Sequence, residues 1–188
     1  MITFGESLTS ARDLFAKLEA LEPEVEKVAA VLSRALREGR RLLLCGNGGS
    51  ASEAQHLAAE LVGRYRLDRR ALPAIALTAD GALLTCLGND FAFEEIFARQ
   101  VEALGSPGDV LIAFTTSGNS PNVQRAVEVA RQRGMVSIAL LGRSGGRLRG
   151  CADLELIVPH DETARIQEAH LFLLHALMDA VESSLGVV

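Results

Sequence analysis

The stretch "LLLCGNGGSASEAQHLAAE", residues 42–60, is the clearest indication of how this chain folds. Its first four residues are an uninterrupted apolar run, typical of a strand buried on both faces of a parallel sheet. A glycine-rich turn follows at residues 46–51, and a helical pattern covers residues 52–63. Ser50 and Glu53 have the spacing of a capping box, which predicts a helix start at about Ala51. A strand that turns directly into a helix is the repeating unit of α/β proteins.

The same alternation continues along the rest of the chain. Short β-rich runs are expected at residues 41–45, 72–78, 109–115, 135–141 and 154–158. Helical patterns lie between and after them, at residues 52–63, 91–104, 123–134 and 164–185. Alternating strands and helices predict an α/β fold of three layers, in which helices cover both faces of a five-stranded parallel sheet.

Residues 5–39 also have a helical pattern, but they precede the first strand. Pro23 divides two apolar stripes and suits the first turn of a second helix. We therefore expect a single domain over residues 1–188, with an N-terminal helical layer at 1–39 and an α/β core at 40–188. Helices outside the main repeat often pack on another subunit, so this layer is a candidate contact between copies.

The composition is that of a globular protein, with 48% hydrophobic residues, 23% charged residues and a net charge of -5. No basic block stands out, so nucleic-acid binding is not expected. A membrane span is not expected either, because no uninterrupted apolar run approaches about 18 residues. The three cysteines, Cys45, Cys86 and Cys151, lack C-x-x-C spacing. We therefore expect no disulfide framework and a reducing, cytoplasmic location.

The glycine turn matches G-x-G-x-x-A, which by itself is weak support for a dinucleotide site. Such a site also needs an acidic residue roughly 20 residues further on, at the end of the second strand. The first acidic residue after the second predicted strand is Asp80, and 80 − 49 = 31 residues separate it from Gly49. The turn therefore either binds another polar ligand through its amides and the helix N-terminus or is a plain strand-to-helix connection.

A second polar loop follows the run at residues 109–115. It gathers hydroxyl and amide side chains where the chain turns into a helix: Thr115, Thr116, Ser117, Asn119 and Ser120. Ser120 suits an N-cap and Pro121 suits the first helical position. Several hydroxyls beside a helix N-terminus favour phosphate binding, and the absence of a G-K-[ST] ending excludes a nucleoside-triphosphate loop.

Histidines recur on two predicted helices. His56, Glu60 and Arg64 follow one another at i, i+4 and i+8, a spacing that an ordinary solvated stripe also has. The last helix carries Gln167, His170 and His175. Two imidazoles, a carboxylate and an amide oxygen suit a four-coordinate divalent cation, although core packing explains a single histidine equally well. Gln167 and His175 are about 12 Å apart along an ideal helix. Either both side chains lean toward one point, or more than one subunit contributes.

Four segments in order, "CGNGGSASEAQHLAAELVGR", "GND", "TTSGNSPNV" and "RIQEAHLFLLH", resemble the phosphoheptose isomerases of the sugar-isomerase (SIS) fold. The resemblance implies a SIS-type fold and an aldose–ketose isomerase. Its reaction would convert sedoheptulose 7-phosphate to D-glycero-D-manno-heptose 7-phosphate, for the heptose of bacterial surface polysaccharide such as lipopolysaccharide. It also implies a cytoplasmic homotetramer with active sites between subunits and one zinc ion per subunit.

Position by position, the resemblance also implies site residues. The substrate-binding set is Asn47, Gly48, Gly49, Glu60, Asn89, Asp90, Thr115, Thr116, Ser117, Ser120 and Gln167. The metal-binding set is His56, Glu60, Gln167 and His175. Glu60 and His175 are also the implied catalytic pair, since a carboxylate and an imidazole can move a proton between C1 and C2 through an enediol.

Two other functions fit the same motifs. One is a non-catalytic SIS protein that binds the replication initiator. That group lacks a carboxylate at the position of Glu60 and a histidine at that of His175, and this chain has both. The other is an isomerase of a pentose or hexosamine phosphate. The length of the sugar depends on the shape of the pocket, so the choice between substrates stays open at this stage.

Overall fold

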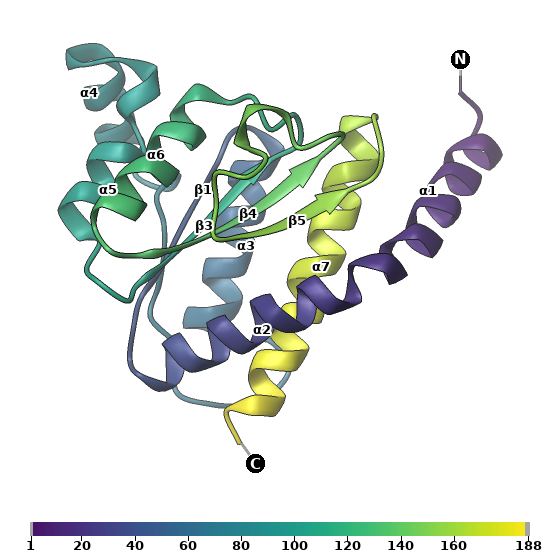
Figure 1. Ribbon diagram of the computed structural model, residues 1–188, viewed down its shortest axis with the longest axis horizontal. Coiled ribbons are helices and arrows are strands. Elements are labelled where there is room, and N and C mark those ends of the chain that lie inside the picture. Colours follow the sequence, from purple (N-terminus) through teal and green to yellow (C-terminus); the bar gives the residue numbers. More distant parts are fainter. Residues whose placement is uncertain (1, 187–188) are drawn as a thin grey trace.

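A computed structural model describes residues 2–186 of the chain (Figure 1). Its centre is a five-stranded sheet in the order β2-β1-β3-β4-β5. The strands are β1 (Leu42–Gly46), β2 (Ala74–Ala76), β3 (Val110–Thr115), β4 (Val136–Gly142) and β5 (Leu154–Val158). Every neighbouring pair is parallel. The predicted α/β fold with a five-stranded parallel sheet is therefore confirmed.

Helices cover both faces of this sheet (Figure 1). One apolar cluster lies between the sheet and helices α2 (Glu22–Arg37), α3 (Gly49–Val62) and α7 (Thr163–Ser184). A second cluster lies on the opposite face, against α5 (Ala98–Leu104) and α6 (Pro121–Gln132). All residues of β1 and β3 are buried, which explains why their sequences are apolar without alternation.

Two helices precede the sheet, as the sequence predicts. α1 (Phe4–Leu18) is followed by a short 3-10 turn, η1 (Glu19–Leu21), and then by α2. A capping box of Thr3 and Glu6 begins α1, and Pro23 lies in the first turn of α2. Figure 1 shows α1 extending away from the sheet, and its outer residues Phe4 and Leu8 are 83% and 58% exposed.

Helix α3 begins earlier than the capping pattern predicts. Gly48 is its N-cap, with a φ of 56°, and no side chain caps the helix. The predicted box of Ser50 and Glu53 is wrong, because Ser50 lies inside the helix and makes no capping hydrogen bond. A Cβ at Gly46 would approach the Ser50 carbonyl oxygen to 2.7 Å, so the turn is too tight for a residue with a side chain. The chain turns into the helix through the positive φ of Gly48, without a side-chain cap.

The segment between β2 and β3 differs most from the prediction. β2 covers only Ala74–Ala76, and α4 (Gly81–Asp90), which the sequence did not reveal, follows it. A 3-10 turn, η2 (Phe93–Glu95), precedes α5, so the single helix expected at 91–104 is wrong in its first half. Of the residues in α4 only Leu87 is buried, and the apolar pattern of Leu83, Leu84 and Leu87 is too short to distinguish this helix from a loop by sequence.

The loops that carry the predicted site residues lie at one edge of the sheet. β1 and β3 are neighbours in parallel register, with Gly46 opposite Phe114. The glycine turn after β1 and the hydroxyl loop after β3 therefore begin side by side, at the carboxyl ends where ligands bind in such sheets. A further 3-10 turn, η3 (Gly146–Leu148), follows β4. Within residues 2–186, no helix is both long and apolar enough to span a membrane.

Candidate active site

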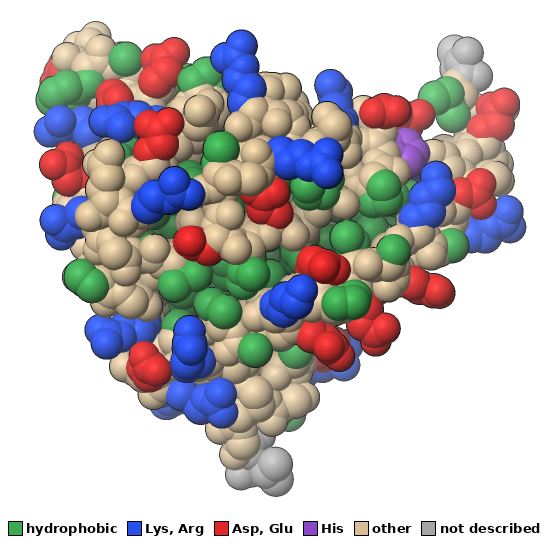
Figure 2. Space-filling model, in the orientation of Figure 1, with side chains coloured by type: hydrophobic (Ala, Val, Ile, Leu, Met, Phe, Trp, Pro, Cys, Tyr) green, Lys and Arg blue, Asp and Glu red, His purple; other side chains and the backbone are tan. Residues whose placement is uncertain are grey.

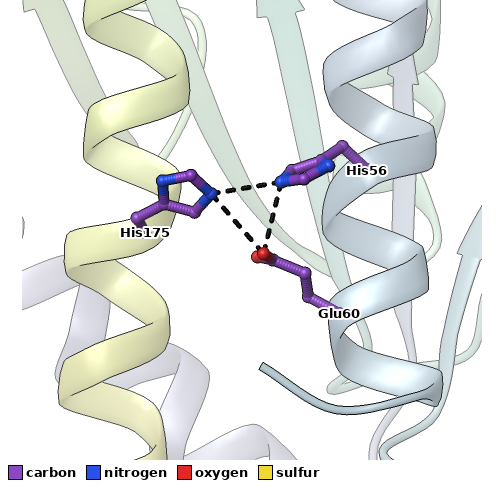
Figure 3. A group of neighbouring side chains, drawn as sticks. All are labelled: His56, Glu60 and His175. Carbon is purple, nitrogen blue, oxygen red and sulfur yellow. Dashed lines mark hydrogen bonds and ion pairs between the residues drawn. The ribbon is translucent and has the colours of Figure 1, made fainter. Parts of the chain in front are cut away.

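Three titratable side chains converge between α3 and α7 (Figure 3). His56 and Glu60 lie one turn apart on α3, and His175 faces them from α7. Glu60 Oε1 is 3.2 Å from His56 Nε2 and 3.5 Å from His175 Nε2. The two Nε2 atoms are 3.1 Å apart. The histidine spacing in the sequence therefore corresponds to one cluster within a single chain.

The donor set of this cluster fits a divalent cation such as zinc. One ligand atom from each of the three residues lies within 4.8 Å of the others. Glu60 Oε2 is buried and accepts no hydrogen bond from the described residues. Two imidazole nitrogens and a carboxylate oxygen are common zinc ligands, and three protein ligands leave a position for substrate or water. The cluster is partly open, since the side chains of His56 and His175 are 45% and 36% exposed.

Gln167 lies at a different point of the site. Its side-chain amide packs so closely on Gly49 that a Cβ at that glycine would overlap it. The residue is about two helical turns before His175 on α7. The structure thus places Gln167 at the glycine turn, next to the predicted sugar-binding backbone. That Gln167 is a fourth metal ligand stays a prediction.

The glycine turn is tied to the second polar loop. Asn47 and Asn122 exchange two amide hydrogen bonds, of 2.9 and 2.8 Å. Asn122 is buried in the first turn of α6, and its Oδ1 also accepts from the amide of Val123. Gly48 and Gly49 are exposed beside this pair. Asn47 therefore has a fixed orientation, and Asn122 is a supporting residue that the sequence analysis missed.

The hydroxyls of the second loop gather at the start of α6. Thr115 Oγ1 is 3.0 Å from Ser120 Oγ and 3.5 Å from Ser117 Oγ. Ser120 is the N-cap residue, as predicted, but its hydroxyl turns toward Thr115 instead of capping the helix. Thr116 is half-buried next to them. Three hydroxyls and a helix N-terminus in one place provide the donors that a phosphate group requires.

A glycine pair after β4 supports the hydroxyl loop. A Cβ at Gly118 would overlap the carbonyl of Gly145, and one at Gly146 would meet the Ser117 carbonyl oxygen at 2.5 Å. Asn119 Oδ1 accepts from the amide of Arg147 in the same turn. The sequence signal for this support was the S-G-G run at residues 144–146, which the motif analysis did not use.

Asn89 and Asp90 are not brought to the cluster in the single chain. They lie at the C-terminal end of α4, are exposed, and bond to each other at 2.7 Å. Cys86, one turn earlier, donates to Asp90 at 3.5 Å, and this hydrogen bond raises the pKa of the Cys86 thiol. Arg64 is also exposed, just beyond the end of α3.

Two further groups are core residues. His170 is fully buried and bonds through Nε2 to the carbonyl oxygen of Leu141 at 3.1 Å, so it belongs to the core and not to the cluster. Its Nδ1 lies 3.6 Å from Oε2 of buried Glu53. Burial raises the pKa of the Cys45 thiol to about 12, which excludes it as a nucleophile at neutral pH.

The chain is similar to known proteins over nearly its whole length. The pattern of the SIS domain matches residues 8–142. The phosphoheptose isomerase of Pelobacter propionicus is 51% identical over 179 residues, 95% of both chains. That of Geobacter sulfurreducens is 54% identical over 172 residues, covering 89% of this chain and 91% of the relative.

Solved structures agree. A phosphoheptose isomerase from Neisseria gonorrhoeae superposes with a TM-score of 0.91 at 42% identity, over 95% of this chain and 96% of the other. One from Francisella tularensis superposes with a TM-score of 0.92 at 40% identity, with the same coverage. The chain belongs to the SIS domain family and, within it, to the phosphoheptose isomerases.

Proposed function

We propose that the protein interconverts sedoheptulose 7-phosphate and D-glycero-D-manno-heptose 7-phosphate. The observation that carries this proposal is the convergence of His56, Glu60 and His175 within 3.1–3.5 Å of one another, at a helix that begins in the glycine turn. In the ketose-to-aldose direction a base removes a proton from C1. The resulting enediol receives a proton at C2, and the hydroxyl proton moves between O1 and O2, so atoms and electrons balance.

Glu60 is the group that we assign to the carbon-bound proton. Its side chain is 14% exposed, and its Oε2 is buried without a donor among the described residues. A carboxylate with an oxygen that accepts no hydrogen bond can accept a proton and return it to the neighbouring carbon. This use of a single carboxylate on both carbons needs no second base for the carbon-bound proton.

We assign His175 to proton exchange with the sugar oxygens O1 and O2. Its Nε2 faces the same point as Glu60 Oε1, so a sugar bound there would have the carboxylate and the imidazole on adjacent groups. An imidazole exchanges protons with hydroxyls near neutral pH. We also propose that His56, Glu60 and His175, with Gln167 as a candidate fourth ligand, hold one zinc ion. When bound, it polarises the sugar oxygens as a Lewis acid.

The remaining residues bind the ends of the sugar phosphate. The hydroxyls of Thr115, Thr116, Ser117 and Ser120 and the N-terminus of α6 bind the 7-phosphate. Asn47, Gly48, Gly49 and Gln167 contact the sugar chain. The support is their position: the glycine turn and the hydroxyl loop share one edge of the sheet, joined by the Asn47–Asn122 pair.

We further propose a homotetramer with active sites between subunits. α1 carries exposed apolar residues away from the body of the chain, and apolar side chains also surface on the face in Figure 2 that carries α1 and α2. Asn89 and Asp90, which the family resemblance assigns to the substrate, are exposed at the end of α4. A neighbouring subunit would cover both regions and bring substrate contacts together.

The reducing cytoplasm is the proposed location, in keeping with the free thiols of all three cysteines. The relatives described above are phosphoheptose isomerases, and they give no support to a role in binding a replication initiator.

A substrate panel tests the proposal. The purified protein should turn over sedoheptulose 7-phosphate far faster than a pentose or hexosamine phosphate. Thermal stabilisation by each sugar separates binding from turnover, since a ligand at 100 times its Kd stabilises by about 2.7 kcal/mol. Glu102→Gln, an exposed carboxylate on α5, is the matched control for substitutions of Glu60. Faster turnover of a shorter sugar phosphate would contradict the heptose assignment.

A further inference from the structure

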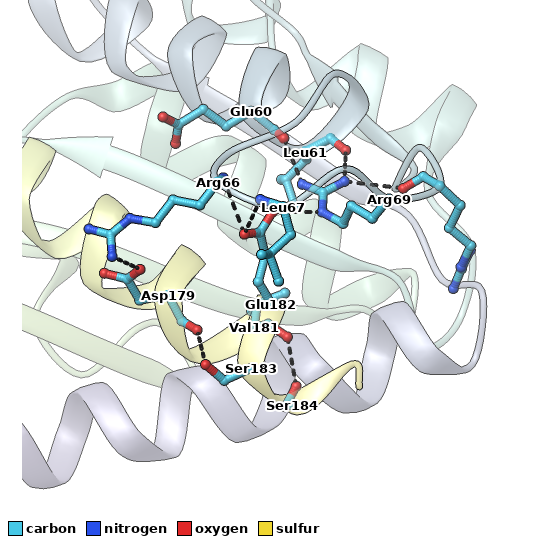
Figure 4. A network of polar contacts seen from close by, with 11 residues as sticks. Glu60, Leu61, Arg66, Leu67, Arg69, Asp179, Val181, Glu182, Ser183 and Ser184 are labelled. Carbon is cyan, nitrogen blue, oxygen red and sulfur yellow. Dashed lines mark hydrogen bonds and ion pairs between the residues drawn. The ribbon is translucent and has the colours of Figure 1, made fainter. Parts of the chain in front are cut away.

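The segment that joins α3 to β2, residues 63–73, contacts both proposed catalytic residues. It contains four arginines, Arg64, Arg66, Arg69 and Arg70, at exposed or half-buried positions, and it has no helix or strand of its own. One of these arginines is not a surface residue. The side chain of Arg69 is fully buried, at 0% exposure, although the residue lies in a highly charged stretch. A buried guanidinium requires several partners, and here they can be named (Figure 4).

Arg69 binds the end of the helix that carries Glu60. Its Nη2 donates to the carbonyl oxygen of Glu60 at 2.7 Å, and its Nη1 donates to that of Leu61 at 2.9 Å. The last carbonyls of a helix have no partner within the helix, so helix ends fray unless something else binds them. Arg69 supplies that partner at the backbone of Glu60 itself (Figure 4).

Glu182 holds Arg69 in place from α7. Its Oε1 accepts from Arg69 Nε at 2.9 Å, and its Oε2 accepts from the amides of Arg66 and Leu67 at 3.2 and 3.1 Å. Burial alone would raise the pKa of the Glu182 carboxyl. The hydrogen bonds from the Leu67 and Arg66 amides and from Arg69 outweigh burial, so its pKa lies below the ordinary value. The carboxylate is therefore charged at neutral pH and anchors both the guanidinium and the backbone of the segment.

The same segment reaches the other proposed catalytic residue. The ring of Tyr65 stacks on the imidazole of His175, with centroids 5.6 Å apart and planes at 18°. Arg66, the next residue, forms an ion pair with Asp179 at 3.0 Å, one turn after His175 on α7. Since Glu182 binds the amides just after Tyr65, the anchor determines where this ring lies.

We propose that residues 63–73 hold the two proposed catalytic residues, Glu60 and His175, in position. Arg69, held by Glu182, fixes the backbone of Glu60, and Tyr65 fixes the ring plane of His175. A buried ion pair by itself is weak support for a stabilising role. Here, however, the pair bonds to the backbone of one catalytic residue, while the ring beside it stacks on the other. A displacement of about 1 Å in such groups is costly to catalysis.

The test uses Tyr65, because removing Arg69 or Glu182 leaves a buried charge unpaired and risks unfolding. Tyr65→Leu removes the ring and retains an apolar side chain. Tyr65→Phe keeps the ring and should restore what Tyr65→Leu loses. Asp68→Ala, in the same segment but outside the contacts described above, is the matched control. We expect Tyr65→Leu to lower kcat by about 3- to 10-fold, the size of one aromatic contact, with little change in KM.

Two further readouts separate positioning from general packing. The ring-proton signals of His175, identified by their loss in His175→Asn, should broaden in the NMR spectrum of Tyr65→Leu, because an unrestrained imidazole exchanges between orientations, and should stay sharp in Tyr65→Phe. Zinc affinity, measured by competition with a chelator, should also fall in Tyr65→Leu alone. His175 signals that stay sharp, or an unchanged kcat, in Tyr65→Leu would overturn the proposal. The kinetic arm rests on the proposed function. If the native protein fails to turn over the heptulose, that function fails, and the NMR and zinc arms still decide the role of Tyr65.

Discussion

The two ends of the proposed active site differ in how complete they are within one chain. His56, Glu60 and His175 are already within 3.5 Å of one another, on two helices that pack side by side. Asn89 and Asp90 instead lie exposed at the tip of α4 and contact mainly each other. The proposed catalytic cluster is assembled by the fold of the monomer, whereas part of the sugar contact depends, in our proposal, on a second copy.

The largest expected effect comes from a substitution in the cluster of His56, Glu60 and His175. His175→Asn removes the imidazole that we assign to the sugar oxygens and one of the three converging donors. We expect kcat to fall by roughly 10²–10⁴-fold, the usual contribution of a general acid or base. Steady-state kinetics measures this, with circular dichroism to check the fold. His160→Asn, a histidine outside the cluster, is the control and should retain turnover.

The next largest effect is expected at the contact between subunits that we propose for α1. Phe4→Glu with Leu8→Glu places charges on the exposed apolar face of α1. If that face contacts another subunit, each substitution should weaken assembly by about 2 kcal/mol. Sedimentation should then show smaller species, and turnover should fall while the His56–Glu60–His175 cluster still binds zinc. A double variant that remains tetrameric and fully active would contradict the role of α1 in assembly.

A smaller effect is expected in the hydroxyl loop. Thr115→Val removes the hydroxyl that lies 3.0 Å from Ser120 Oγ and retains the shape of the side chain. A hydrogen bond to a charged group is worth about 1.5–3 kcal/mol, so KM should rise by about 10- to 100-fold. Thr115→Ser keeps the hydroxyl and should behave like the native protein. Equal KM values for the valine and serine variants would show that Thr115 does not bind phosphate.

The last expected effect is on stability instead of turnover, and it concerns pH and the ion pair of Arg69 and Glu182 that anchors residues 63–73. The pKa of Glu182 is below its ordinary value in the folded protein, so its charged form stabilises the fold above pH 4.5. That contribution should be lost as the pH falls below 4.5 through the lowered pKa. Urea unfolding across this range measures it. In Glu182→Gln the stability should be lower at neutral pH, and the gap to the native protein should narrow in acid. A gap that stays constant with pH would contradict the assignment.

Much of this fold could be predicted from the sequence, because buried parallel strands leave apolar runs that are easy to recognise. The helix α4 could not, since it has only ten residues and a short apolar pattern of Leu83, Leu84 and Leu87. The capping pattern of Ser50 and Glu53 gave a wrong prediction because Ser50 lies inside α3, which begins after Gly48, a glycine with a positive φ.

The candidate site also contains residues that the sequence identifies and residues that only the structure identifies. His56, Glu60 and His175 stand out because imidazoles on two helices are few in a chain with only four histidines. The Arg69–Glu182 anchor joins residues that are 113 positions apart and that look like ordinary surface charges in the sequence. Only the three-dimensional structure shows that both side chains are buried and that Arg69 binds the backbone of Glu60.

The most direct test of the central claim is turnover of sedoheptulose 7-phosphate by the native protein and by Glu60→Gln, with and without added zinc. The account predicts turnover by the native protein and a loss of about 10²–10⁴-fold in the variant, which keeps the shape of the side chain but cannot accept the proton. Glu102→Gln should match the native rate. Native protein that is folded and tetrameric but inactive in any metal, or a Glu60→Gln variant with the native rate, would contradict the account.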